Sequence, residues 1–178
     1  MITVAGLDLS LTSTGLSVGD TLIAISTKTK GVERLDYIAN VICGHLAQAE
    51  NPIVIIEGYA FASRNSQAHA IGELGGVVRW HLWKAGISWV DVPPTCRAKF
   101  ATGKGNASKG EVLSAVSART GIVWTGSGAD DMCDAWILQE CGLAKIGKPR
   151  YDWPQSHLTA LEKVDWSAID TLLNKDIA

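Results

Sequence analysis

The fold class of this chain follows from the segment Ile2-Thr3-Val4-Ala5-Gly6-Leu7-Asp8-Leu9-Ser10 and its continuation Leu11-Thr12-Ser13-Thr14-Gly15-Leu16-Ser17-Val18. An apolar run ends on the carboxylate Asp8, and a short segment rich in Ser and Thr precedes a second apolar run. This pattern predicts a strand, a tight turn and a returning strand. Because a carboxylate that closes a buried strand costs free energy unless it has a partner, Asp8 is a candidate functional residue.

The remaining periodicities predict an α/β fold with a five-stranded mixed sheet flanked by helices. Three strands are expected in an antiparallel meander, at 2–8, 14–19 and 22–27, and two parallel strands at 53–57 and 87–92. Apolar residues at helical spacing predict helices at about 31–49, 67–85, 95–101, 108–119 and 130–143.

The composition changes after Lys148, where Pro149, Trp153 and Pro154 predict an extended passage before a short helix near 165–173. The chain is therefore expected to comprise a main domain at 1–148 and a C-terminal tail at 149–178. We expect the tail to pack on the domain or on a dimer partner.

The overall composition suits one compact domain with a substantial core. The chain has 178 residues, of which 47% are hydrophobic and 19% charged, and its net charge is −2. No global basic field is present, so binding to nucleic acid would depend on local patches. The four cysteines form no C-x-x-C pair, which argues against a zinc site or a disulfide framework. No apolar run approaches the roughly 20 residues that span a bilayer, and a cytoplasmic protein that binds no membrane is expected.

Three further acids stand where they could join Asp8. Glu57 ends the apolar strand 53–57, and Asp131 and Asp134 lie three residues apart at the start of a predicted helix, on one face. Carboxylate oxygens are the ligands that Mg²⁺ prefers, and two ions about 4 Å apart can promote phosphodiester cleavage. The alternative is that the helical acids only complement the helix dipole and that the strand-end acids are solvated.

A basic segment and two aromatic residues indicate contacts with nucleic acid. Between 95 and 110 the chain carries four basic residues, several glycines and no acid, as expected for a loop that binds phosphates. A solvated loop is the competing interpretation, and the P-loop pattern does not fit. After Glu57, an exposed aromatic could stack on an unpaired base, although core packing would also explain it. The candidate DNA-binding residues are Tyr59, Phe61, Arg64, Asn65, Arg97, Lys99, Lys104 and Lys109.

Four segments occur in a defined order along the chain. They are Gly6-Leu7-Asp8-Leu9-Ser10-Leu11 with Thr14-Gly15; Ile55-Ile56-Glu57, followed by Phe61, Asn65 and Gly72-Glu73-Leu74-Gly75-Gly76; Lys99 with Thr102-Gly103-Lys104-Gly105-Asn106-Ala107-Ser108-Lys109; and Asp131-Met132-Cys133-Asp134-Ala135. Together these segments resemble the motifs of the RuvC family of Holliday junction resolvases, within the RNase H-like superfamily. The resemblance spans about residues 2–143.

The resemblance implies a homodimeric, structure-selective endonuclease that cleaves branched DNA, with Holliday junctions as the first expected substrate and forks or flaps as alternatives. Asp8, Glu57, Asp131 and Asp134 would bind two Mg²⁺ ions, which Mn²⁺ can replace, and no nucleotide cofactor is expected. Together with these four acids, Lys109 would be a catalytic residue. Lys109 and Lys99 would contact the scissile region or its phosphates, and Phe61 would lie near the junction centre.

The chain departs from the family pattern at several points, which suggests a divergent or phage-type member acting in the host cytoplasm. The spacing from Glu57 to Phe61 is one residue longer, so Tyr59 competes for the aromatic role. The spacing from Lys99 to the glycines is one residue shorter, and Asp130 competes with Asp131 in the last pair. The tail after 148 matches no family motif.

The same residues are compatible with three different functions. Asp8-Leu9-Ser10 with Thr12-Ser13-Thr14-Gly15 also resembles the phosphate loop of actin-like and sugar-kinase phosphotransferases, although that fold needs two such lobes. A non-catalytic module for branched DNA is a second possibility, and an RNase H acting on RNA–DNA hybrids is a third.

The helix predicted at 67–85 contains glycines 72, 75 and 76. Each glycine in a helix interior costs about 1 kcal/mol relative to alanine. A close approach of another helix or of a DNA backbone would compensate for this cost, and we expect this helix to form part of a two-fold interface.

Overall fold

The computed structural model describes residues 2–59 and 66–175, and it contains one five-stranded sheet in the order β3-β2-β1-β4-β5. β1 pairs antiparallel with β2 and parallel with β4, and β4 pairs parallel with β5. The predicted mixed α/β sheet is therefore confirmed. The strands are β1 (Thr3–Asp8), β2 (Thr14–Val18), β3 (Thr21–Ile25), β4 (Pro52–Glu57) and β5 (Ser88–Val92).

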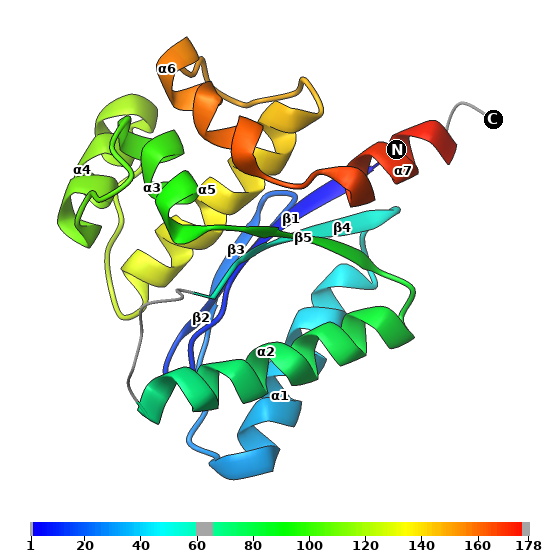
Figure 1. Cartoon of the computed structure of the whole chain (residues 1–178). Coiled ribbons are helices and arrows are strands. Elements are labelled where there is room, and N and C mark those ends of the chain that lie inside the picture. The colour runs from blue at the N-terminus through cyan, green and yellow to red at the C-terminus, as the bar shows by residue number, and fades with distance from the viewer. Residues whose placement is uncertain (1, 60–65, 176–178) are drawn as a thin grey trace.

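Helices cover both faces of the sheet, with α1 and α2 on one face and α3, α4 and α5 on the other (Figure 1). Successive side chains of β4 point to opposite faces, so Ile53 and Ile55 pack in the cluster with α5 while Val54 and Ile56 pack with α1 and α2. The helices are α1 (Gly31–Leu46), α2 (Ser66–Lys84), α3 (Pro94–Thr102), α4 (Lys109–Thr120), α5 (Ala129–Lys145), α6 (Gln155–Leu158) and α7 (Ser167–Lys175), with a 3₁₀ turn η1 (Thr159–Lys163).

Helix α5 lies directly on β1 and β2 because glycines there leave room for its backbone. A Cβ at Gly6 would overlap the carbonyl oxygen of Ala135 and the amide nitrogen of Gln139, and one at Gly15 would overlap the carbonyl oxygen of Asp131. The side chain of Gln139 then donates to the carbonyl oxygen of Val4 at 3.0 Å. This seating fixes both the height and the rotation of α5 over the sheet.

The segment after α5 is more helical than the sequence pattern predicts. Instead of an extended passage, residues 155–163 form α6 and η1, and the final helix begins two residues later than expected. Helices of four and five residues are too short to produce a periodic apolar pattern. Apolar side chains of this segment, including Leu161, Val164 and Trp166, join the cluster that contains α5.

No helix in the described part of the chain is long and apolar enough to cross a membrane. The described elements otherwise follow the predicted boundaries within a few residues. The division at residue 148 remains a proposal.

We expect Gly6→Ala to destabilise the chain by about 1–3 kcal/mol, because the added methyl group would collide with backbone atoms that cannot rotate away. The control is Gly44→Ala in α1, where a Cβ would meet none of the described residues within 4 Å and where alanine should stabilise the helix by up to about 1 kcal/mol. Urea unfolding measures both variants. Equal midpoints for the two variants would show that the sheet does not need glycine at residue 6.

A candidate carboxylate site at the strand ends

Four acids converge at one end of the sheet. β1 and β4 run parallel with Leu7 opposite Ile56, so their last residues, Asp8 and Glu57, lie side by side at the carboxyl ends. Asp131 and Asp134 stand in the first turns of α5, which the contacts at Gly6 and Gly15 hold against β1 and β2.

Burial and mutual repulsion govern the charges of this group. Burial raises the pKa of Asp8 well above its ordinary value, and the nearby charges of Glu57 and Asp134 add to that rise. Burial likewise raises the pKa of Asp134 to about 7, although the Arg97 guanidinium opposes this rise. Carboxylates that perturb one another in this way are typical of functional sites.

Arg97 lies inside the group of acids rather than on an exposed loop. Its Nε donates to Glu57 Oε2 and its Nη1 donates to Asp134 Oδ1. The Arg97 side chain, which α3 carries, is only 11% exposed. The sequence pattern suggests DNA binding for Arg97 and does not predict these contacts.

Asp130 and Asp131 have different surroundings. Asp130 accepts a 2.6 Å hydrogen bond from Lys109 Nζ, and this bond lowers the pKa of Asp130. Burial, with the neighbouring Asp130 charge, raises the pKa of Asp131, and Asp131 is among the charges that act on Asp8. These contacts favour Asp131 over Asp130 as the fourth member of the group.

The basic residues of the glycine-containing segment mostly face solvent. The Lys104 and Lys109 side chains are 69% and 65% exposed, and Lys99 is half-buried on α3. Ser108 caps α4 through a reciprocal capping box with Glu111, which ends the loop at a fixed point. Exposed lysines beside a fixed helix start can contact phosphates.

Tyr59 is held against α2 while its ring stays partly exposed. Arg79 Nη1 donates to the Tyr59 hydroxyl at 3.0 Å, and the Arg79 guanidinium lies 5.0 Å from the Tyr59 ring centroid. A Cβ at Gly75 would overlap the Tyr59 hydroxyl, so the Tyr59 ring would have to shift if residue 75 carried a side chain. The other candidates after Glu57, namely Phe61, Arg64 and Asn65, lie outside the described residues.

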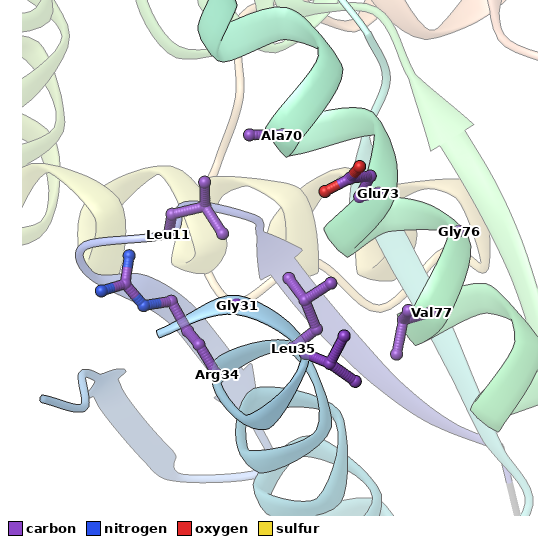
Figure 2. A pocket seen from close by; sticks show the side chains of 9 residues that line it. Leu11, Gly31, Arg34, Leu35, Ala70, Glu73, Gly76 and Val77 are labelled. Atoms are coloured by element: carbon purple, nitrogen blue, oxygen red, sulfur yellow. The ribbon is translucent and has the colours of Figure 1, made fainter. Parts of the chain in front are cut away.

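Two hollows flank the N-terminal half of α2. One, of about 430 Å³, includes both Asp8 and Glu57 in its lining together with Leu9, Tyr59 and Ile71. The other, of about 570 Å³, lies between α1 and α2, where Arg34 and Glu73 accompany Leu11, Leu35 and Val77 (Figure 2). Only the first of these two hollows includes acids of the site.

The donor set fits a hard divalent cation, because all four acids offer carboxylate oxygens. As the side chains stand, however, no three acids, histidines or cysteines of residues 2–59 and 66–175 are grouped closely enough to hold an ion. Two of the four acids, Glu57 and Asp134, bind Arg97 instead.

The fold is RuvC-like. A RuvC structure from Thermus thermophilus superimposes with a TM-score of 0.61 over 85% of this chain and 99% of that one, at 23% sequence identity. A structure of T. thermophilus RuvC in complex with a Holliday junction substrate gives a TM-score of 0.60, 22% identity and coverage of 86% and 100%. No protein-family model and no curated protein matches the sequence. The two likenesses confirm the fold suggested by the sequence motifs.

In the presence of a chelator, we expect the chain to lose stability as the pH rises from about 5 to about 8. Folded Asp134 keeps its proton up to a pKa of about 7, against an ordinary value of 3.8, so the folded chain binds more protons in this window and the free energy of unfolding falls with pH. Asp134→Asn removes this titration. Between these two pH values, the free energy of unfolding of the variant should therefore fall by about 2 kcal/mol less than that of the wild type.

Urea unfolding at the two pH values measures the difference, with Asp20→Asn as the control on the exposed β2–β3 turn. An identical pH dependence in wild type and Asp134→Asn would contradict the raised pKa.

Proposed function

We propose that this protein is a metal-dependent, structure-selective endonuclease that cleaves branched DNA, with Holliday junctions as the first candidate substrate. The proposal is carried by the convergence of Asp8, Glu57, Asp131 and Asp134 at one end of a RuvC-like sheet. The similarity to T. thermophilus RuvC, one structure of which contains a Holliday junction substrate, supports it.

The four acids would hold two Mg²⁺ ions, which Mn²⁺ can replace. Bound there, the ions would supply an activated water and neutralise charge on the leaving oxygen. The chain itself provides rigid placement, because two acids sit at paired strand ends and two on a helix whose backbone is locked to the sheet.

The surroundings of the acids suit a polynucleotide. The hollow beside Asp8 combines carboxylates with apolar walls from Leu9 and Ile71, which could accept a sugar or an unpaired base. Exposed Lys104 and Lys109 would bind phosphates and position the strand without reading its sequence.

We expect Asp8→Asn to slow cleavage of a four-way junction in Mg²⁺ by at least roughly 1,000-fold, because the substitution removes a metal ligand. Binding of the junction should survive, because the substitution removes no phosphate contact. Asp20→Asn, on an exposed turn, should cleave as the wild type does. The assay measures nicking of labelled DNA, and binding is followed separately by gel shift in Ca²⁺.

A panel of substrates distinguishes the proposal from its rivals. Four-way junction, fork, flap, duplex and RNA–DNA hybrid are compared at equal concentration. Preference for the hybrid would indicate an RNase H, and binding without metal-dependent nicking would indicate a non-catalytic module. Unchanged turnover by Asp8→Asn would remove the assigned site altogether.

We further infer that the protein acts as a homodimer formed through the exposed face of α2. Gly72, Gly76, Trp80 and Trp83 recur at helical spacing, and both tryptophans are exposed, at 52% and 69%. No atom of the described residues lies within 4 Å of a Cβ placed at Gly72 or Gly76, so the packing of this described part of the chain does not require these two glycines.

Replacing both tryptophans, as Trp80→Ser with Trp83→Ser, should convert the protein from a dimer to a monomer, because aromatic anchors carry much of the energy of such interfaces. Light scattering should give twice the 18.9 kDa chain mass for the wild type and the single chain mass for the variant. Val123→Ser removes another exposed apolar side chain and should leave the dimer intact. A monomeric wild type at working concentration would refute the inference.

A further inference from the structure

We propose that Arg97 is the resident counter-ion of the acid site and that a divalent cation displaces its guanidinium from Glu57 and Asp134 on binding. This inference rests on the proposed metal dependence but concerns a different residue and a different property. It assigns Arg97 a charge-compensating role: the guanidinium pairs with two of the acids in the metal-free protein and competes with the metal for their oxygens.

The contacts of Arg97 are those of an internal cation. Its Nε and Nη1 each bind a carboxylate oxygen, and the two acids come from different elements, the end of β4 and the second turn of α5. Among the side chains of residues 2–59 and 68–174, Arg97 is the only basic one that is buried. Removing the cation from such a buried group is costly, because it leaves the charges of its carboxylate partners uncompensated.

A cation at this position reduces the repulsion among the acids of the site. Asp8, Glu57 and Asp134 repel one another, and the exposed Lys109 is paired with Asp130. A planar guanidinium can bind two carboxylates at once through separate nitrogens, whereas an ammonium group is a single point of charge.

The helix that carries Arg97 is braced from outside. Phe100 is fully buried and its ring centroid lies 4.3 Å from that of Trp153. His157 Nδ1 lies 2.8 Å from the Phe100 carbonyl oxygen. The guanidinium is therefore presented from a rigid α3, and only the side chain has to move for a metal to replace it.

The oxygens held by Arg97 are the same ones that a metal would need. Glu57 and Asp134 each have at least one carboxylate oxygen engaged by the guanidinium. Metal binding must then break or share these ion pairs, and the free energy of the exchange lowers the apparent metal affinity. Removing the guanidinium should tighten metal binding and, at the same time, leave the metal-free acids uncompensated.

The test compares Arg97→Met with wild type in chelator and in Mn²⁺ at about pH 8. In chelator, Arg97→Met should unfold at a lower temperature, because Glu57 and Asp134 lose their counter-ion. In Mn²⁺, it should regain most of that loss, and its Kd for Mn²⁺ by calorimetry should be at least about tenfold lower than that of wild type. Arg97→Lys keeps the positive charge but loses the guanidinium that binds two carboxylates at once. Its unfolding temperature in chelator and its Kd for Mn²⁺ should lie between those of the wild type and Arg97→Met.

The matched control is Arg150→Met. Arg150 Nε binds the fully buried Glu140 at 2.5 Å, six residues beyond Asp134 on the same helix, so its loss also breaks an arginine–carboxylate pair. Its destabilisation should not be rescued by Mn²⁺, because Glu140 is no part of the site. Equal rescue of both variants would show that the metal stabilises the fold generally and would overturn the role of Arg97.

Other outcomes separate the two proposals. Wild type that neither binds Mn²⁺ nor cleaves junctions would overturn the proposed function and this inference together. Wild type that binds Mn²⁺ and cleaves, with unchanged Mn²⁺ affinity in Arg97→Met and Arg97→Lys, would overturn the counter-ion role alone. If Arg97→Met is unfolded in chelator, refolding on addition of Mn²⁺ supports the role. If Arg97→Met fails to refold in Mn²⁺ and the metal does not stabilise Arg97→Lys either, the role is contradicted.

Discussion

Helix α5 meets the sheet through its backbone, because Gly6 and Gly15 place no side chain beneath the carbonyl oxygens of Ala135 and Asp131. Protein interiors transmit small displacements, since they are packed as densely as crystals. A helix raised by one methyl group would carry Asp131 and Asp134 away from the strand that bears Asp8. The relative position of the acids thus depends on the absence of side chains at Gly6 in β1 and Gly15 in β2. This close contact links the fold to the chemistry of the site.

Much of the fold could be predicted because its signals are local. The apolar runs that end on Asp8 and Glu57 predict parallel strand ends, and parallel pairing then brings these two acids together. The spacing of Asp131 and Asp134 places them on one helix face. α6 and η1 could not be predicted, because elements of four and five residues have no measurable period.

The role of Arg97 could not be read from the sequence, because a long side chain on a short helix can point to solvent or inward with the same neighbours. Its proximity to Lys99 and Lys104 favoured solvent. Only the tertiary arrangement, with α3 packed beside α5, places the guanidinium between Glu57 and Asp134. In the structure, five of the nine residues of α3 are buried, so this helix packs into the domain and does not merely display basic residues to solvent.

The C-terminal segment is attached through Glu140, a carboxylate with no exposure, which accepts from the Arg150 side chain and from Trp153 Nε1. Trp153 in turn supports Phe100 and the rest of α3. Since protein domains gain their structure as the chain leaves the ribosome from its N-terminus, every acid of the site is translated before the residues that steady α3. A product of premature termination near residue 148 would thus contain all four acids and Arg97 yet lack the Trp153 ring that supports α3, so the helix that carries Arg97 gains this support only after residue 153 has been translated.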